Sequence, residues 1–161
     1  MNDLIKQINL VESLSKYTIE LKILHEGEYV TAVNISPDGE QSVEIPIEDG
    51  VYMTEYGTVN FPGTHILQHI LYWIESTLSL KLEDIMNQIF ERDFSEFEIE
   101  QEMRNYESEI NLYIKSYISS YVKKVSFLSA KAGETEQLPY YFDLSLLERY
   151  IICQICQQPT T

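Results

Sequence analysis

The start of the chain repeats its apolar side chains at the period of an α-helix. Asn2 or Asp3 can cap this helix, and we expect it to end near Ser15. Its predicted buried face consists of the apolar residues Leu4, Ile5, Ile8, Val11 and Leu14. A stripe of this width is typical of a helix that packs with one side against a core.

The next stretches alternate apolar and polar side chains, which is the pattern of half-buried β-strands. We expect strands over residues 17–23, 29–35 and 43–47, separated by turn sequences that contain glycine. Strands joined by short turns pair antiparallel, so the pattern predicts a three-stranded meander. Pro46 has no backbone N–H to donate, and the third strand should therefore lie at an edge of the sheet or end there.

Residues 51–63 fit either a short strand or a packed loop, because their apolar side chains are compatible with both. Thr64 then provides a cap for a helix whose apolar side chains recur through Ile89. Ser79 is a candidate position for a bend in this helix.

A second long helix is predicted to begin after Ser95. Ser95 and Glu98 match a capping box, in which each side chain binds the backbone amide of the other residue. Apolar side chains then recur at steps of three and four, which favours an antiparallel hairpin with the preceding helix. The stripe consists of Ile99, Met103, Tyr106, Ile110, Tyr113 or Ile114, Tyr117 and Tyr121. Its tyrosines suit either a core or a homodimer interface.

The end of the chain predicts a polar loop over residues 129–139 and a last helix capped by Asp143. The apolar residues of that helix are Leu144, Leu147, Ile151 and Ile155. Together the elements predict an α+β fold, with an N-terminal helix and three-stranded antiparallel meander followed by a helical hairpin and a C-terminal helix. We expect residues 1–63 to form the helix-and-sheet module and residues 64–161 to pack on it in one compact unit.

The composition is that of a folded chain with a large excess of acidic side chains. Hydrophobic residues make up 44% and aromatic residues 12% of the 161 residues, whereas disordered acidic chains are poor in both. The 26 Asp and Glu outnumber the 11 Lys and Arg, so the formal charge is −15. Phosphate groups repel such a protein, which argues against direct binding to nucleic acid or to a membrane and favours a basic protein partner.

No signal-peptide pattern and no apolar stretch of membrane-spanning length is present, so we expect a cytoplasmic protein. The two cysteines are too few for a disulfide scaffold, and we expect both thiols to be reduced.

Two short motifs have metal-ligand spacing, but each is incomplete. Cys153 and Cys156 resemble a zinc half-site or a redox pair, yet the second pair of zinc ligands is missing. His65 and His69 are one helical turn apart, but Ile66 replaces the glutamate of a zinc-hydrolase motif. Phosphate-binding loops and nucleophile elbows are also missing from the sequence. We therefore expect no metal, no cofactor and no catalytic residues.

Acidic residues at the start of the second long helix form a first group of candidate partner-binding residues. The group comprises Glu96, Glu98, Glu100 and Glu102. The helix dipole stabilises early glutamates, so a solvated helix start that needs no partner explains this group equally well. The rival interpretation is that these carboxylates imitate phosphates in a channel lined by lysine and arginine.

A second acidic group lies at the turns of the predicted sheet. It comprises Glu26, Glu28, Asp38, Glu40, Glu48 and Asp49. Short turns on a rigid sheet hold charges in fixed positions, as recognition of an ordered array of Arg or Lys requires.

Three segments of the N-terminal third carry a family resemblance: residues 2–8, 17–21 and 38–40 read NDLIKQI, YTIEL and DGE. In these segments the chain resembles the small acidic anti-CRISPR proteins of prophages that inhibit type II-A Cas9. The resemblance implies a helix, a three-stranded antiparallel sheet and further helices, and binding where Cas9 reads its short DNA motif. It also implies that Asp38 and Glu40 face the paired arginines of that site. The rest of the chain departs from the family's pattern.

Charge and resemblance together predict a phage or mobile-element inhibitor that acts in the bacterial host cell. It would bind a nucleic-acid-handling defence protein, with guide-loaded Cas9 as first candidate, and block DNA binding by acidic mimicry. One alternative is an immunity protein that neutralises a basic nuclease toxin. A second is a small enzyme without a local motif, which would have a deep pocket with convergent polar groups.

Overall fold

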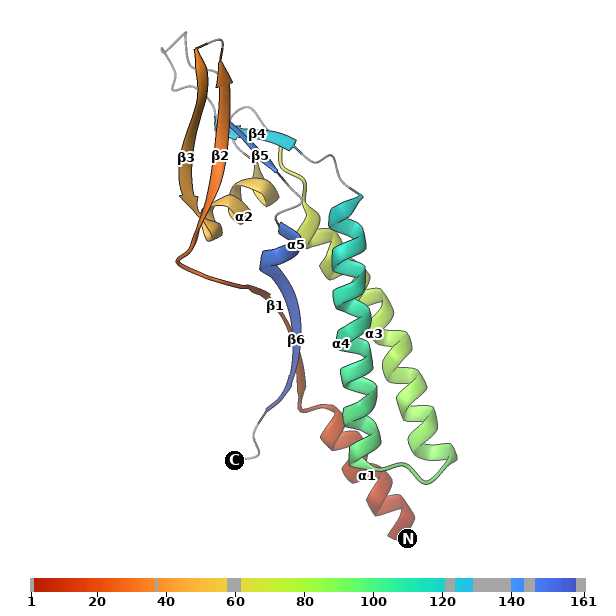
Figure 1. Ribbon diagram of the computed structural model, residues 1–161. Helices are drawn as coiled ribbons and strands as arrows, with labels where there is room; N and C mark the ends of the chain where they lie inside the picture. Colours follow the sequence, from red (N-terminus) through yellow and green to blue (C-terminus); the bar gives the residue numbers. More distant parts are fainter. Residues whose placement is uncertain are drawn as a thin grey trace. The chain divides into compact units, whose positions relative to one another are not determined.

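The computed structural model describes residues 2–36, 38–57, 62–120, 124–128, 140–143 and 147–158. Its elements follow in the order α1 (Asn2–Leu14), β1 (Tyr17–Ile23), β2 (Tyr29–Ser36), β3 (Gly39–Pro46), α2 (Ile47–Tyr56), α3 (Ile66–Glu91), α4 (Glu96–Ser119), β4 (Lys124–Leu128), β5 (Tyr140–Asp143), α5 (Leu147–Tyr150) and β6 (Ile151–Gln157) (Figure 1). Helices occur together with antiparallel strands, so the predicted α+β class is confirmed.

The chain folds into two compact units. The first consists of Met1–Lys22, Leu71–Tyr113 and Cys153–Thr161, and the second of Ile23–Ile70 and Ile114–Ile152. Each unit joins stretches that are far apart in the sequence, and the expected division after residue 63 lies within the second unit.

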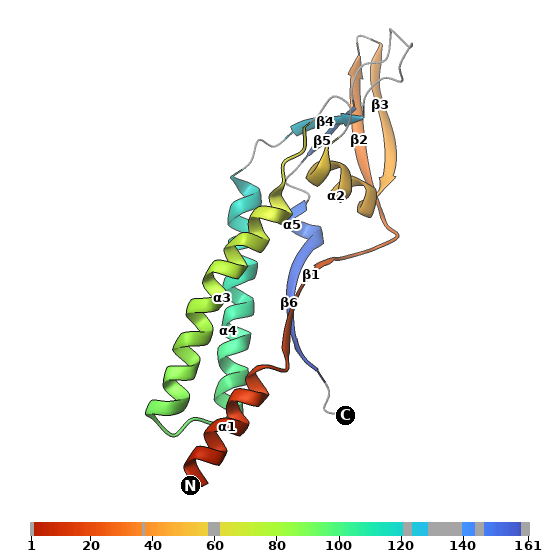
Figure 2. The same cartoon turned by 180° about the vertical axis from the view of Figure 1, so that it is seen from behind.

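In the first unit, α3 and α4 pack antiparallel, as the sequence predicts (Figure 2). The rings of Trp73 and Tyr113 stack with 4.1 Å between their centroids. Further along, Lys81 Nζ lies 2.6 Å from Glu102 Oε2. Residue numbers therefore rise along α3 as they fall along α4. Helix α3 continues without a break through the candidate bend at Ser79.

Helix α4 begins with the predicted capping box. The Glu98 amide donates to Ser95 Oγ at 3.2 Å, and the Ser95 amide donates to Glu98 Oε2 at 3.0 Å. The buried face of the helix is Ile99, Met103, Tyr106, Ile110, Ile114 and Ile118. Tyr113 and Tyr117 are half-buried. The predicted stripe is thus confirmed as far as Tyr117, and Tyr121 lies outside the described residues.

The buried face of α1 agrees with the predicted one at Leu14 and differs from it at the start of the helix. Leu10 and Leu14 are buried at 5% and 7% exposure. About half of the surface remains exposed in the predicted core residues Leu4, Ile5 and Ile8. Lys6, one turn before Leu10, forms an exposed ion pair with Asp93, which follows the end of α3. Helical periodicity alone does not choose between two overlapping apolar stripes, and here the packing of Leu10 and Leu14 decides.

Strand β1 pairs with β6 and not with β2. The Gln158 amide donates to the Lys16 carbonyl at 2.8 Å, and Thr18 Oγ1 donates to the Cys156 carbonyl at 3.3 Å. Residue numbers fall along β6 as they rise along β1, so the two strands are antiparallel. The predicted meander of three consecutive strands is therefore wrong, because its first strand belongs to another sheet.

The predicted C-terminal helix is also wrong beyond the four residues of α5. From Ile151 onward the side chains alternate, with Ile151, Cys153 and Ile155 buried. Leu147, Ile151 and Ile155 are spaced by four residues, a distance that satisfies the helical period and the strand period alike. Pairing with β1, which lies more than 120 residues earlier, selects the strand.

Side chains of α4 occupy the second edge of β6, where a neighbouring strand would otherwise bind. Asn111 Nδ2 donates to the Cys153 carbonyl at 3.0 Å, and the Cys153 amide donates to Asn111 Oδ1 at 2.8 Å. Two residues on, the Ile155 amide donates to Glu107 Oε2 at 2.7 Å, and Arg104 Nη1 donates to the Ile155 carbonyl at 2.9 Å. We call Arg104, Glu107 and Asn111 the α4 clamp.

Replacing Asn111 by Ala should destabilise the protein by about 2 to 3 kcal/mol, because the Cys153 N–H and C=O would both lose their partner. Urea unfolding followed by circular dichroism measures this loss. Asn105→Ala removes an exposed amide from the same helix and should change the unfolding free energy by less than about 0.5 kcal/mol. Equal effects of the two substitutions would contradict the role of the clamp.

The second unit contains an antiparallel sheet of order β3-β2-β5-β4. The predicted β2–β3 hairpin is confirmed, with a register from Tyr29 opposite Pro46 to Ser36 opposite Gly39. Strand β3 forms an edge of this sheet and ends at Pro46, as the missing N–H of proline predicts.

Helix α2 covers one face of the hairpin and occupies part of the stretch expected as a short strand or loop. Gly50 lies in this helix where it approaches the hairpin, since a Cβ there would be 3.4 Å from Val30 and 3.7 Å from Ile45. Glycine is a common turn signal, but here it permits close packing of a helix on the hairpin. The expectation of a short strand or packed loop over residues 51–63 is therefore wrong for residues 51–56. Val59 and its neighbours over 58–61 lie outside the described residues.

The N-terminus of α3 is capped by a buried carboxylate, that of Glu55. Its two oxygens accept from the Leu67 amide at 2.7 Å and the Gln68 amide at 3.0 Å. Thr64, the predicted cap, contributes a longer contact of 3.4 Å to the Ile66 amide. Gly63 allows the turn between α2 and α3, because a Cβ at this position would lie 2.6 Å from the Glu55 carbonyl oxygen.

Two glycines with similar positive φ angles allow the cost of backbone strain to be measured apart from the cost of a steric clash. Gly63 has φ +83° and a blocked Cβ position, whereas Gly27 has φ +89° and open space. Gly27→Ala should cost about 1 kcal/mol for the left-handed backbone alone. Gly63→Ala should cost at least about 2 kcal/mol more, because the turn must also shift. Thermal unfolding of both variants measures the difference, and equal costs would rule out the clash.

Candidate interaction surface

The two faces of the β2–β3 hairpin have opposite character. Val30, Ala32 and Ile45 are buried on the face that α2 covers. On the other face Glu40 and Glu44 are exposed, and Glu44 lies between the half-buried Val43 and the buried Ile45. Tyr29 at the start of β2 is 61% exposed on this same outer face, opposite Pro46. The hairpin therefore presents carboxylates from a backbone that the α2 packing holds in place.

The stretch of chain that contains these carboxylates is rich in acidic residues. Residues 23–70 contain eight Asp and Glu and neither Lys nor Arg. Glu55, one of the eight, is buried as the cap of α3. We use the name acidic hairpin for the outer face of β2 and β3 together with the turns at its two ends. Its acidic residues are Glu26, Glu28, Asp38, Glu40, Glu44, Glu48 and Asp49. The stretch of chain that forms it therefore carries acidic charge and neither Lys nor Arg.

The base of the acidic hairpin brings together four residues that the sequence analysis selected: Glu26, Glu28, Glu48 and Asp49. The Gly27 amide donates to Glu48 Oε1 at 2.6 Å, and the Ile47 amide donates to the Glu28 carbonyl at 3.0 Å. His25 Nδ1 lies 3.5 Å from a Glu28 carboxylate oxygen. The turn that precedes β2 is thus tied to the start of α2. The sequence analysis predicts this turn at the tip of a hairpin between β1 and β2. That hairpin does not form, because β1 pairs with β6.

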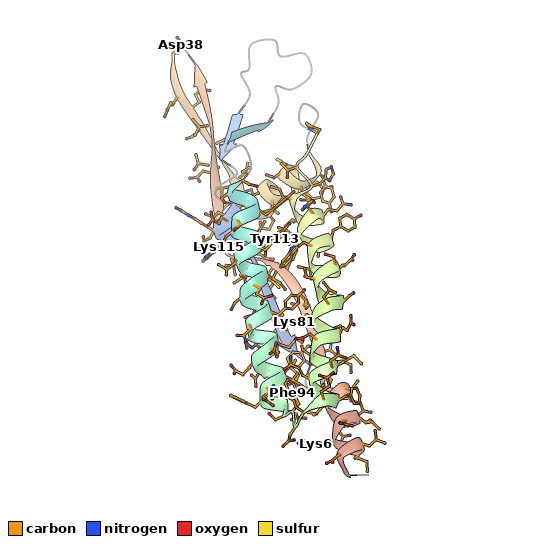
Figure 3. The ribbon with its side chains drawn as sticks, turned by 90° about the vertical axis from the view of Figure 1, so that its right-hand side faces the viewer. Lys6, Asp38, Lys81, Phe94, Tyr113 and Lys115 are labelled. Atoms are coloured by element: carbon orange, nitrogen blue, oxygen red, sulfur yellow. The ribbon has the colours of Figure 1, made fainter. Side chains whose placement is uncertain are left out.

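Asp38 and Glu40 lie at the opposite end of the hairpin, where Figure 3 labels Asp38. Seven residue steps of an extended strand separate Ser36 from Tyr29, a distance of about 23 Å. The six turn residues selected from the sequence therefore form two groups, at the tip and at the base. Glu44 lies between them on the outer face, and the sequence analysis did not select it. Its alternation with Glu40 around Ser42 was the signal for it.

The acidic group on α4 is in the first unit, and half of it is used within the protein. Glu98 belongs to the capping box and also accepts from Arg92 at 3.1 Å. Glu102 pairs with Lys81. Glu96 and Glu100 remain exposed. Burial and, after it, the charges of Glu100 and Glu96 raise the pKa of the Tyr17 hydroxyl, and Arg104 opposes them. Helix capping and an internal ion pair thus account for Glu98 and Glu102.

Packing inside the protein accounts for the two cysteines and for His69. Cys153 is buried in β6, and burial, reinforced by the charge of Glu107, raises the pKa of its thiol to about 12. Cys156 on the same strand is half-buried. His69 stacks on Tyr117 with 4.5 Å between ring centroids. Within the described ranges, no three His, Cys, Asp or Glu side chains are grouped so that they could hold a metal ion.

At pH 8 a thiol with a pKa of about 12 is ionised to about one part in ten thousand, so Cys153 should resist alkylation in the folded protein. Iodoacetamide should label Cys156 alone in buffer and both cysteines in denaturant, as intact mass measures. Cys156→Ser should abolish the native labelling and Cys153→Ser should preserve it. Rapid native labelling of Cys153 would contradict its burial.

Among the described helices, none combines the length and the apolar character that crossing a membrane requires. Comparison of the chain with protein-family models, with curated proteins and with solved structures finds no match.

Proposed function

We propose that this protein binds a basic, nucleic-acid-handling protein through the acidic hairpin and thereby excludes nucleic acid from it. The observation that carries the proposal is the row of exposed carboxylates on a hairpin with one covered and one exposed face, within residues 23–70, a stretch without Lys or Arg. The action requires binding alone and no chemical step.

The arrangement of the carboxylates supports recognition of an ordered array of cations. Glu40 and Glu44 are held on one strand at about 13 Å, four residue steps apart, by the ladder between β2 and β3. Fixed acceptors lose little conformational freedom when an Arg or Lys binds, so more of the interaction energy remains for affinity. A site built in this way competes for the cations that otherwise bind phosphates.

The total charge supports fast association with a basic cleft. With a formal charge of −15, long-range attraction raises the rate of encounter, and added salt weakens it. Nucleic acid, which carries the same sign of charge, is repelled by the inhibitor and competes for the same partner.

Guide-loaded Cas9 is the first partner to test. Asp38 and Glu40, which lie in the segment that resembles the anti-CRISPR proteins, are at the tip of the acidic hairpin. In Cas9 a pair of arginines reads the short DNA motif, and carboxylates can compete for them. The pairing of β1 with β6 departs from the sheet order that this family implies. The resemblance therefore concerns the β2–β3 hairpin and does not extend to a complete three-stranded sheet.

The decisive experiment is a competition in which guide-loaded Cas9 binds labelled target DNA at low and at moderate salt. The protein should displace the DNA, and less effectively at the higher salt. The double substitution Asp38→Lys and Glu40→Lys should raise the concentration for half-displacement at least about tenfold. Glu83→Lys with Glu91→Lys makes the same change of net charge at exposed positions of α3 and should have a much smaller effect.

The other outcomes redirect the assignment. If the Asp38 and Glu40 variant displaces DNA normally while Glu96→Lys with Glu100→Lys does not, the contact is on α4 and the proposed site is wrong. If Cas9 does not bind the protein, the resemblance was chance. Inhibition of a basic nuclease under the same conditions would then identify an immunity protein.

A further inference from the structure

The first unit contains an apolar groove with a volume of about 560 Å³. One wall consists of alternate residues of β1, namely Tyr17, Ile19 and Leu21. The other wall is a stripe along α3: Leu71, Glu75, Leu78, Leu82 and Met86. Ile74 and Met103 in its floor are buried, whereas Leu71 and Met86 at its two ends are 49% and 39% exposed. Val11, Leu14 and Ser15 at the end of α1 also line this trough.

The trough lies between α3 and the face of β1 that carries Tyr17, Ile19 and Leu21, and residues of β6 do not line it. The other strand of this sheet has both edges satisfied, by β1 and by the α4 clamp. Strand β1 has β6 on one edge, and among the described residues no strand pairs with the other. A row of backbone N–H and C=O groups therefore borders an apolar trough.

The two strands β1 and β6 form a narrower layer than the two helices α3 and α4, which explains why the trough exists. Neighbouring strands are about 4.8 Å apart, whereas packed helices are 8 to 10 Å apart. The clamp ties β6 to α4, so β1 lies near the seam between α3 and α4, and Figure 3 shows both strands behind that seam. Two strands are too narrow to cover two helices. The stripe of α3 remains uncovered for that reason.

The length of the trough and the free edge of β1 favour an extended segment over a helix. The α3 wall from Leu71 to Met86 spans fifteen residue steps, or about 22 Å. An extended segment of about seven residues covers this length. It would lie about 4.8 Å from β1 and bind the backbone groups of the free edge, which a helix in the groove would leave without partners.

We propose that the trough binds an extended segment of a partner protein, which adds to the free edge of β1 as a third strand and covers the stripe of α3. This is a second interaction site, in the other unit from the acidic hairpin, and it does not depend on the function proposed for that hairpin. Main-chain hydrogen bonds to β1 supply affinity, and side-chain contacts with α3 supply selectivity.

The walls specify the chemistry of this segment. Side chains directed at α3 meet leucine, isoleucine and methionine, so they are apolar at alternate positions. The one charge in the walls is Glu75, which favours a Lys or Arg beside it. Side chains on the outer face lie next to Thr18 and to the Glu20–Lys22 ion pair, where uncharged polar residues fit.

A displayed library of random nonapeptides, selected on the full chain, tests the proposal. We expect selected peptides to alternate apolar and polar residues and to shift the backbone amide NMR signals of β1. Leu71→Glu should weaken the best peptide at least about tenfold. Leu80→Glu is the matched control, since Leu80 is a 68% exposed leucine of α3 outside the trough, and it should leave affinity within about twofold.

Methylation of alternate peptide amides separates strand addition from simple apolar contact. Methylating the amides that face β1 should abolish binding, and methylating the others should not. Apolar residues spaced by three and four in the selected peptides would overturn the proposal in favour of a helix. Binding that survives Leu71→Glu, or a failure to select any peptide, would also overturn it. A concentration-dependent dimer lost in Leu71→Glu would identify a second copy as the occupant instead.

Discussion

The side-chain clamp of α4 on β6 is the interaction from which the architecture of the first unit follows. Arg104, Glu107 and Asn111 lie on one side of a helix at steps of three and four and bind the backbone of alternate strand residues. They give β6 the hydrogen bonds that a third strand would provide, and β6 in turn pairs with β1. The last strand is thereby tied both to the helical hairpin and to the first strand of the chain.

The same constraint decides which surfaces remain uncovered. With β6 held on α4, β1 reaches only the seam of the hairpin, and the α3 stripe that begins at Leu71 faces a trough. In the second unit a different constraint acts, since Gly50 lets α2 approach one face of the β2–β3 hairpin and leaves the other face outward. Close packing of one side therefore creates each candidate surface: an apolar trough in one unit and an acidic face in the other.

Several elements could be predicted from the sequence because their signals are local. The capping box of Ser95 and Glu98, the apolar stripe of α4, the β2–β3 hairpin and the end of β3 at Pro46 each depend on residues within a few positions of one another. The acidic residues of the hairpin were likewise recognised, because charge is a property of composition. Their division into a tip and a base was not, since it required the strand register and the pairing of β1.

By itself, then, the sequence determined the α+β class, the helical hairpin, the β2–β3 hairpin and the excess of negative charge. Only the tertiary structure decided the partner of β1, the strand conformation of residues 151–157, the buried face of α1 and the helical conformation of Ile47–Tyr56. The physical reason is the same in each case. Leu147, Ile151 and Ile155 satisfy two periodicities, the two stripes of α1 overlap, and Gly50 fits both a turn and a close helix contact. Hydrogen bonds and packing from residues far along the chain select one state from such local ambiguities.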